Sequence, residues 1–302
     1  MPSLVNPKER TLGQFRVGPI SYGLWRFTGD DLRTAHGLIE SALDAGMNLI
    51  DVSDVYGFDW GGTGFGSVEA RLGSVLAKAP ALRDRMVLAT KGGITPPTPY
   101  DSSAEYLREA CEGSLRRLNA DVIDLYQVHR PDMFTHPAEV AATLSALRDE
   151  GKIREVGISN YTPDQYDALA AHMPFPIAAT QPEYSALHLG PLRDGTFDRC
   201  MRDGIVPLAW SPLGGGRLFS DAAEGGPSPE LAGILDALAE REGVDRAAIA
   251  IAFVLAHPSS AVAIIGTQSV DRILSSNAAL TVNLDRADVY GIVQASEGAA
   301  LP

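Results

Sequence analysis

The residues best suited to chemistry follow a short apolar run in the first third of the chain. Residues 46–57 read Gly-Met-Asn-Leu-Ile-Asp-Val-Ser-Asp-Val-Tyr-Gly. The run 47–50 is too short for a helix and is typical of a strand buried on both faces. Asp51, Asp54 and Tyr56 follow it, which is where an α/β barrel places active-site groups. The alternative interpretation is an ordinary strand followed by a solvated acidic loop.

Two more reactive side chains follow apolar runs. Lys91 comes after the run 86–90 and is one of only four lysines among the 25 lysines and arginines. His129 comes after the run 122–128 and is the one histidine of six at such a position. An amine and an imidazole can hold or transfer protons during a reaction. Taken singly, each placement is also explained by chance or packing.

The other apolar runs end at polar or aromatic residues as well. Because the carboxyl ends of barrel strands share one face, we expect these side chains to lie together. In chain order they are Trp25, Asp51 with Tyr56, Lys91, His129, Ser159 with Asn160, Gln181, Trp210 and Gly266. Turn residues alone would not supply this range of chemistry, so the set favours one functional face.

The elements that would position these residues alternate regularly. Helical patterns separate strand-like runs, and two helix starts read as capping boxes, Ser102 with Glu105 and Thr162 with Gln165. Further helices are expected near 192–202 and 270–279. The alternation predicts an α/β fold, namely a (β/α)8 TIM barrel. We expect a small N-terminal hairpin around Gly13, extra C-terminal helices and a single domain over residues 1–302. The strand-like runs cover residues 19–25, 47–50, 86–90, 122–128, 153–158, 177–180, 205–209 and 262–265.

Composition limits the partners of the protein. The chain has 302 residues and a net charge of −13, which argues against nucleic acid or an anionic membrane as partner. Cys111 and Cys200 lie far apart and are expected to be reduced core residues. The N-terminus lacks the apolar core of a signal peptide, and the longest apolar run, 247–256, is about half a bilayer span. We therefore expect a cytoplasmic protein; no pattern indicates a particular oligomeric state.

Signatures of several other chemistries are missing from the sequence. No Gly-x-Gly-x-x-Gly follows the first strand, so a Rossmann nucleotide site is not expected. The chain also lacks Gly-x-x-x-x-Gly-Lys-Ser/Thr, His-Glu-x-x-His and Gly-x-Ser-x-Gly. No cluster of histidine, cysteine and carboxylates has zinc spacing, so we expect no metal.

Seven segments, in order along nearly the whole chain, resemble the aldo-keto reductases. They cover residues 46–57, 90–91, 128–131, 157–161, 181–184, 209–213 and 265–269. The phrases at 213–219 and 129–132 resemble a bacterial subgroup of oxidoreductases whose physiological substrates are often unassigned. The resemblance implies NADPH-dependent reduction of a small-molecule aldehyde or ketone to an alcohol, with the reverse reaction also open.

The resemblance further implies a catalytic tetrad of Asp51, Tyr56, Lys91 and His129, and all four positions match. The chemistry of these residue types fits that role. Tyr56 would donate the proton, with Lys91 expected to lower its pKa. Asp51 would keep Lys91 charged, and His129 would hydrogen-bond the carbonyl oxygen.

The resemblance also assigns a cofactor site across the barrel mouth. Ser159, Asn160 and Gln181 would hold the nicotinamide carboxamide, and Trp210 would stack on the nicotinamide ring. Arg272 would be the main cation for the 2′-phosphate, because Gly266 stands where some relatives carry lysine; NADH therefore stays possible. The pyrophosphate would lie under Ser211, Leu213, Gly216 and Arg217, and the adenosine end near Gly266, Thr267, Gln268, Arg272 and either Ser276 or Asn277.

Apolar residues near the strand ends are candidates for the substrate pocket, although each could equally pack within its own loop. They are Trp25, Trp60, Met133, Phe134 and Phe219. Two other functions stay open at this point. One is a cofactor-sensing subunit with the same fold, and the other is a barrel hydrolase or isomerase with no nicotinamide.

Overall fold

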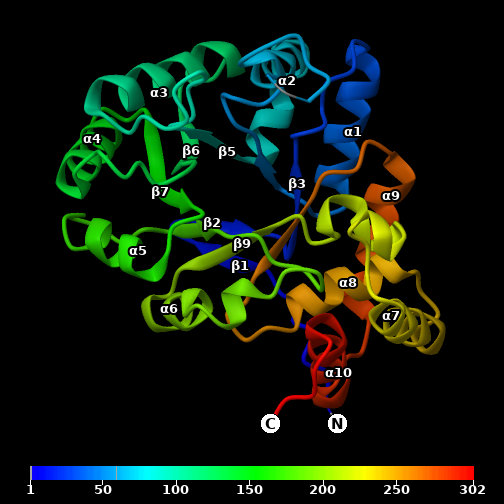
Figure 1. Cartoon of the computed structure of the whole chain (residues 1–302). Helices are drawn as coiled ribbons and strands as arrows, with labels where there is room; N and C mark the ends of the chain where they lie inside the picture. Colours follow the sequence, from blue (N-terminus) through cyan, green and yellow to red (C-terminus); the bar gives the residue numbers. More distant parts are fainter. Residues whose placement is uncertain (1, 59) are drawn as a thin grey trace.

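Eight parallel strands close into a barrel in the computed structural model, which describes residues 2–58 and 60–302 (Figure 1). The strand order round the barrel is β10-β3-β4-β5-β6-β7-β8-β9, so successive strands are neighbours. The expected TIM barrel is confirmed. Its strands are β3 (Ile20–Gly23), β4 (Leu49–Asp51), β5 (Val87–Gly92), β6 (Ile123–Val128), β7 (Ile153–Ser159), β8 (Ala179–Gln181), β9 (Val206–Trp210) and β10 (Val262–Ile265).

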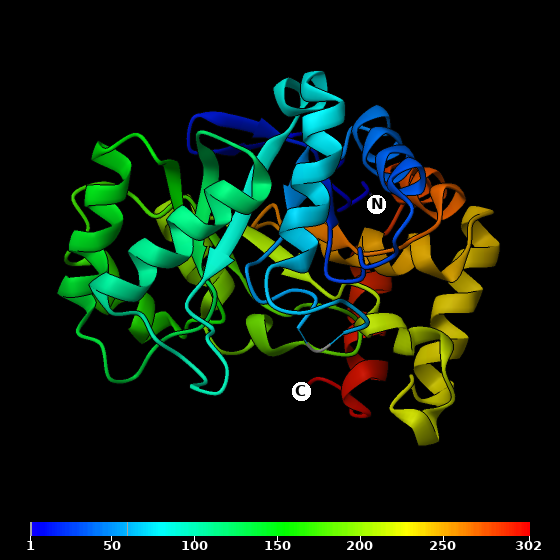
Figure 2. The same cartoon turned by 90° about the horizontal axis from the view of Figure 1, so that it is seen from above.

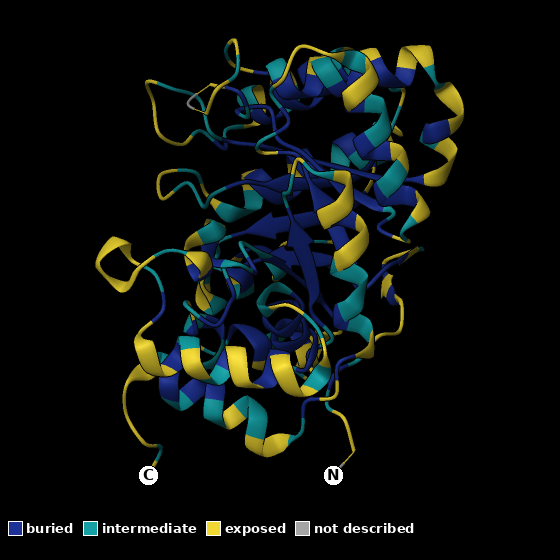
Figure 3. Cartoon of the chain, turned by 90° about the vertical axis from the view of Figure 1, so that its right-hand side faces the viewer, coloured by how far each residue is buried: buried dark blue, intermediate teal, exposed yellow. Residues whose placement is uncertain are grey.

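The strands are buried on both faces, which explains their continuous apolar runs. Every residue of β4, β5 and β6 is buried. Figure 3 shows the strands as a buried centre, with helices around them whose outer faces are exposed. The register pairs Lys91 with Gln127 and Ser159 with Gln181. Polar residues from successive strands are thereby aligned near the carboxyl ends.

Helices cover the outside of the barrel, and their first residues follow local capping rules. Asp31 caps the first helix by accepting from the backbone N–H groups of Arg33 and Thr34. The expected capping box of Thr162 and Gln165 is confirmed. The helices are α1 (Leu32–Asp44), α2 (Ser67–Lys78), α3 (Ala104–Leu118), α4 (Pro137–Asp149), α5 (Pro163–Ala170), α6 (Thr196–Asp203), α7 (Pro229–Glu242), α8 (Arg246–Leu255), α9 (Val270–Ser275) and α10 (Arg286–Glu297).

Three predicted helix boundaries are wrong. The Ser102–Glu105 capping box does not form, because Ser103 is the N-cap of α3 and accepts from the Tyr106 N–H. The helix expected from 192 begins at Thr196, since Gly195 adopts a left-handed φ of 86° just before it. The helix expected over 270–279 ends at Ser275 and continues only as a 3-10 turn, η5 (Ser276–Thr281).

The predicted N-terminal hairpin closes the bottom of the barrel. It consists of β1 (Arg10–Leu12) and β2 (Phe15–Val17), paired antiparallel. Leu12 and Val17 pack in one cluster with Leu49 and Val87, which lie at the starts of their strands. Figure 2 shows the hairpin on the opposite side of the barrel from the long loops after β4 and β5. The mouth at the carboxyl ends is therefore the open end.

The C-terminal helices add a layer beside the last strands. α7 and α8 both lie between β9 and β10 in sequence, and α10 packs against α7. The N-terminal segment joins this layer through backbone hydrogen bonds from Leu4 to Leu284 and from Asn6 to Leu255. Among residues 2–58 and 60–302, no helix has the length and apolar character needed to span a bilayer.

Candidate active site

A buried ion pair joins two neighbouring strands near the barrel mouth. Lys91 Nζ donates to Asp51 Oδ2 over 2.7 Å and to the Val52 carbonyl over 2.9 Å. Both side chains are buried, so each charge is compensated mainly by the other. Burial lowers the pKa of Lys91, but Asp51 and Tyr56 together outweigh it and the net shift of the pKa is upward. Lys91 is therefore a fixed ammonium at neutral pH.

Tyr56 lies against this ammonium. Its hydroxyl is 3.2 Å from Lys91 Nζ, and the ammonium lies 4.9 Å from the centre of its ring. Burial raises the pKa of Tyr56, and the nearby Lys91 only partly offsets that increase. Lys91 thus lowers the pKa of Tyr56 as expected, but burial outweighs it, so a net lowering of that pKa does not occur. The phenol is protonated at neutral pH, and Lys91 is in place to stabilise the phenolate when the proton leaves.

The free oxygen of Asp51 is held by two amides. Gln127 Nε2 donates to Asp51 Oδ1 over 3.2 Å, and Gln181 Nε2 donates to the same oxygen over 3.0 Å. The carboxylate is thus anchored from β6 and β8 as well as by Lys91. Sequence reasoning missed Gln127; its polar side chain inside the apolar run 122–128 was the available signal. Gln181 reaches the tetrad, while its expected contact with a cofactor carboxamide stays a prediction.

His129 follows β6 and faces Tyr56, with ring centres 5.9 Å apart at an angle of 76°. Its Nδ1 lies 2.9 Å from Ser53 Oγ. Burial, together with the charges of Lys91 and Arg130, holds the pKa of His129 well below its usual value. The ring is therefore neutral, and Nε2 is the nitrogen left to meet a ligand. The four tetrad residues predicted from separate strands come together here.

A chain of hydrogen bonds connects the next three strand ends. Ser159 Oγ donates to the Gln181 carbonyl over 2.9 Å, and Asn160 Nδ2 donates to Ser159 Oγ over 2.8 Å. Trp210 Nε1 donates to Asn160 Oδ1 over 3.0 Å. Asn160 has a left-handed φ of 59°, so its backbone leaves the strand direction at this point. The amide and indole predicted to hold a nicotinamide are thereby locked to one another.

The loop after β9 presents open backbone at the mouth. Ser211 has a φ of 51°, and Gly215 and Gly216 have φ values of 68° and 98°. A Cβ at either glycine would meet nothing within 4 Å, so a ligand can approach this backbone closely. Arg217 Nε donates to the Gly214 carbonyl within the loop, and Arg26 Nη2 donates to the Gly215 carbonyl. Leu213 precedes the 3-10 turn of this loop, η3 (Gly214–Phe219).

The segment after β10 lies beside β3. The Tyr22 hydroxyl donates to the Thr267 carbonyl over 2.9 Å, and Gln268 Nε2 donates to the Tyr22 hydroxyl over 3.2 Å. Gly266, the residue after β10, would place a Cβ at ordinary contact distance from the Gly23 carbonyl. Arg272 is exposed, and its guanidinium forms no ion pair with the described residues. This end of the mouth thus offers a free positive charge.

The two candidates for the adenine contact differ in their bonding. Asn277 Nδ2 donates to the Ala45 carbonyl at the end of α1 over 3.0 Å, while Ser276 Oγ donates back to the Arg272 carbonyl over 2.7 Å. Asn277 therefore ties η5 to α1. Its adenine contact, like that of Ser276, stays a prediction.

The predicted pocket residues fall into two groups. Trp25 and Trp60 pack together with ring centres 5.1 Å apart, and the Arg26 guanidinium lies over both rings. Met133 and Phe134 are 74% and 95% exposed, so they do not pack within their loop. Phe219 is exposed as well. The structure thus brings the two indoles together and leaves the other three apolar residues in solvent.

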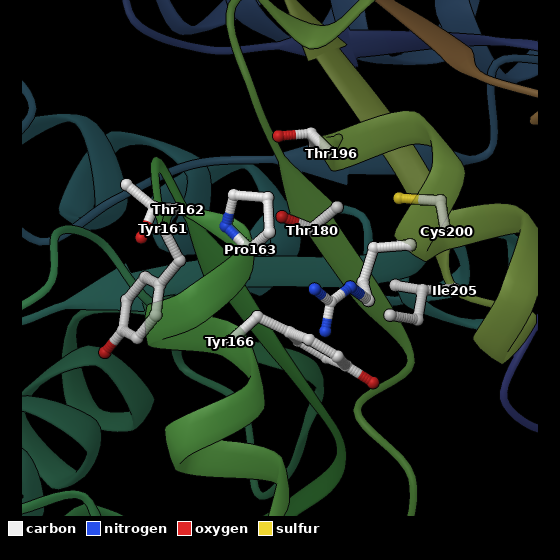
Figure 4. Close-up of a pocket in the computed structure, with 9 residues that line it drawn as sticks. Tyr161, Thr162, Pro163, Tyr166, Thr180, Thr196, Cys200 and Ile205 are labelled. Atoms are coloured by element: carbon white, nitrogen blue, oxygen red, sulfur yellow. The ribbon is translucent and has the colours of Figure 1, made fainter. Parts of the chain in front are cut away.

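A separate hollow lies between α5 and α6 (Figure 4). It is lined by Tyr161, Tyr166, Thr180 and Cys200 among others, none of them in the tetrad. Its one charged lining residue, Arg199, is already paired with Asp167. Among the described residues, no group of histidine, cysteine and carboxylates could hold a metal ion. The chemistry therefore concentrates at the barrel mouth.

The barrel fold and the residues at its mouth can be compared with known protein families. The sequence profile described as "Aldo/keto reductase family" matches residues 19–297. The chain belongs to this family, which confirms the resemblance. It is an NAD(P)H-dependent oxidoreductase that acts on small-molecule carbonyl compounds, so the alternative of a barrel hydrolase or isomerase is wrong.

Two reductases and one solved structure show how similar the chain is to individual proteins. The chain is 48% identical over 300 residues to the 6-dehydroglucose reductase of Novosphingobium aromaticivorans, covering 98% of each chain. It is 36% identical to the 6-dehydroglucose reductase of Agrobacterium fabrum, over 90% of this chain and 92% of that one. The glycerol dehydrogenase AKR11B4 of Gluconobacter oxydans superposes with a TM-score of 0.83 at 25% identity, covering 98% of each chain.

Proposed function

We propose that this protein reduces the carbonyl group of a sugar-like aldehyde to an alcohol with NADPH, and that 6-dehydroglucose is the first substrate to test. The observation that carries the reductase chemistry is the contact of the Lys91 ammonium with both Asp51 and the Tyr56 hydroxyl. The substrate class is suggested by the two relatives named 6-dehydroglucose reductase.

The tetrad supplies the proton in the proposed reaction. Tyr56 donates its hydroxyl proton to the carbonyl oxygen, and the phenolate that remains is stabilised by Lys91 Nζ at 3.2 Å. Asp51, held by Gln127 and Gln181, keeps the ammonium in place. His129 donates a hydrogen bond to the carbonyl oxygen and so orients it. A nicotinamide cofactor, when bound, supplies the hydride for the carbonyl carbon.

The residues at the mouth fit such a cofactor. Ser159, Asn160 and Trp210 present an amide and an indole next to the tetrad. The open backbone at Gly215 and Gly216 suits a pyrophosphate, because no side chain keeps its oxygens away from this loop. Arg272, which forms no ion pair with the described residues, suits the 2′-phosphate that distinguishes NADPH from NADH.

Cofactor titration tests this proposal first. Binding of NADPH and of NADH would be followed by quenching of tryptophan fluorescence, and turnover by loss of NADPH absorbance with 6-dehydroglucose. We expect tighter binding of NADPH and measurable turnover. Binding of neither cofactor would refute the proposal. Tight NADPH binding without turnover of any carbonyl would instead support the cofactor-sensing subunit.

Arg272→Ala isolates the proposed 2′-phosphate contact. Loss of a charge-assisted hydrogen bond costs about 1.5–3 kcal/mol, so NADPH binding should weaken by roughly 10- to 100-fold. NADH lacks the phosphate, and its dissociation constant should change little. Arg286→Ala, at the first residue of α10 and away from the mouth, is the matched control. An equal loss of affinity for both cofactors would remove Arg272 from this role.

A further inference from the structure

Two tryptophans pack against each other at the rim of the barrel mouth. The ring centres of Trp25 and Trp60 are 5.1 Å apart, and the ring planes are tilted by 37°. The two residues come from different loops, since Trp25 follows β3 and Trp60 lies in the loop after β4. Both loops adjoin the tetrad, because the Leu24 N–H donates to the Asp51 carbonyl over 2.8 Å and Trp60 follows Tyr56 by four residues. The indole pair therefore flanks the catalytic groups without being one of them.

Arg26 fixes the position of this indole pair. Its guanidinium lies 5.7 Å from the centre of the Trp25 ring and 5.2 Å from that of the Trp60 ring. The same guanidinium donates to the Gly215 carbonyl over 2.8 Å, in the loop after β9. A cation over aromatic faces is attracted by their π electrons, so Arg26 joins three loops of the mouth. The pair is thus held in place before any ligand arrives.

Much of each indole is nevertheless open to solvent. Trp25 is 41% exposed and Trp60 is 45% exposed. Indoles carry a large apolar surface, and covering it with a ligand removes that surface from water, which is favourable. A fixed, exposed apolar surface beside an active site is typical of a surface that binds a ligand.

The chemistry of 6-dehydroglucose suits such a surface. Its aldehyde carbon, carbon 6, lies outside the pyranose ring, so the ring stays closed while the carbonyl reaches Tyr56 and His129. A pyranose ring has hydroxyl groups round its edge, whereas its two faces carry mainly C–H groups and are apolar. An indole can pack on one face and leave the hydroxyl groups in water. An open-chain aldose, which carries its aldehyde at carbon 1, has no such face.

We propose that Trp25 and Trp60 form a platform for the closed pyranose ring, and that the substrates of this protein are aldehydes carried outside such a ring. The inference rests on the proposed function for the carbonyl reaction, but stacking of the ring is a separate property of the mouth. The hydride and the proton follow the route described above. The platform holds the ring so that the exocyclic carbonyl reaches the tetrad, which makes both tryptophans specificity-determining residues.

Stacking can be tested with a ligand that has no carbonyl group. Methyl β-D-glucopyranoside has a locked ring, with the axial protons of carbons 1, 3 and 5 on one face and those of carbons 2 and 4 on the other. In saturation-transfer difference NMR, we expect the protons of one face to receive clearly more saturation than those of the other, and Trp60→Ala to abolish this difference. Equal saturation of both faces in the wild type, or no binding, would overturn the proposal.

Turnover then tests the substrate class. The matching aldehyde, methyl 6-dehydro-β-D-glucopyranoside, would be compared with glyceraldehyde, which is an open-chain aldehyde. Trp60→Ala and Trp25→Ala should each lower kcat/KM for the pyranoside by roughly 10- to 100-fold, as for lost contacts in an apolar pocket, and mainly through KM. The loss for glyceraldehyde should be much smaller. Trp60→Phe keeps a flat ring and should recover most of the pyranoside activity.

Tyr290→Ala is the matched control, because it removes an aromatic side chain of similar exposure, 48%, from α10. It should change neither the NMR pattern nor the preference between the two aldehydes. If Trp60→Ala loses kcat/KM equally on both aldehydes, the two tryptophans do not select a closed ring. A wild type that binds the glycoside by one face but reduces neither aldehyde would support the platform and refute the proposed reduction.

Discussion

Lys91 lies at the centre of the site, because its three hydrogen bonds reach a carboxylate, a carbonyl and a phenol. A lysine in this position cannot be exchanged for arginine, whose planar fork is wider than the point charge of an ammonium. The same contacts explain why Tyr56 stays protonated yet can give up its proton. Burial favours the phenol, and the ammonium favours the phenolate.

Tyr56→Phe tests this division of roles. The substitution removes the proposed proton donor but keeps the ring, so cofactor affinity should remain while kcat falls by about 10²–10⁴-fold, the range for loss of a general acid. Stopped-flow binding of NADPH and steady-state turnover measure the two effects separately. Tyr290→Phe, on the exposed side of α10, is the control and should behave as wild type. Full activity of Tyr56→Phe would mean that another group donates the proton.

At the level of elements, short local signals decide where helices begin. Ser103 rather than Ser102 caps α3, although both serines precede the same helix. Ser103 has an extended ψ of 155°, and its hydroxyl reaches the Tyr106 N–H. The Ser102 N–H is bonded instead to Asp132 Oδ2 over 3.0 Å, which ties the start of α3 to the loop after β6.

The two serines form a matched pair for a stability measurement. Ser103→Ala should lower the free energy of unfolding by about 1 kcal/mol, the usual cost of losing an N-cap. Ser102→Ala removes a hydroxyl that has no partner in the described part of the chain, and it should cost clearly less. Chemical denaturation followed by circular dichroism would measure both. The reverse order of the two costs would restore the capping box first expected at Ser102.

Two helical glycines should respond in opposite ways to alanine. A Cβ at Gly73 in α2 would clash with the Arg117 carbonyl of α3, so Gly73 is what allows the two helices to pack closely. Gly73→Ala should destabilise the protein by about 1–3 kcal/mol. Gly37 in α1 has nothing within 4 Å of its added Cβ, so Gly37→Ala should stabilise by about 0.5–1 kcal/mol. Equal effects in thermal unfolding would contradict this account of the α2–α3 contact.

At the level of the whole molecule, a partly buried histidine in the C-terminal layer makes stability depend on acid. His257 follows α8 and packs on Phe197 with ring centres 4.4 Å apart. Its Nδ1 accepts from the Ser259 N–H over 3.2 Å. Burial lowers the pKa of His257 from 6.5 to about 4, with Asp198 opposing that shift. The folded protein therefore holds this ring neutral.

The sign of the pH dependence follows from that shift. Between pH 6.5 and about 4 the unfolded chain binds a proton at His257 that the folded chain does not, so stability falls as the pH is lowered through this window. His257→Gln cannot titrate, and its unfolding midpoint in urea should depend less steeply on pH than that of the wild type. His36→Gln, on the partly exposed surface of α1, is the control. Parallel curves for wild type and His257→Gln would show that this histidine does not sense acid.

The sequence alone determined the barrel and the identity of its reactive face. Continuous apolar runs alternating with helical patterns can bury their strands only in a parallel sheet, and residues after such strands must share one end. Asp51, Tyr56, Lys91 and His129 could be selected for that reason, before any contact was known. The capping box of Thr162 and Gln165 could likewise be predicted from the sequence, because the two residues lie three positions apart.

Only the tertiary structure decided which side chains meet across the barrel. Gln127 reaches Asp51, and Ser53 reaches His129, over separations of 76 residues in each case. Such contacts depend on strand register and on the tilt of each side chain, and neither leaves a local pattern in the sequence. The direction of the Tyr56 pKa shift was misjudged for the same reason. It is a balance between burial and a neighbouring charge, and the depth of burial exists only once the chain has folded.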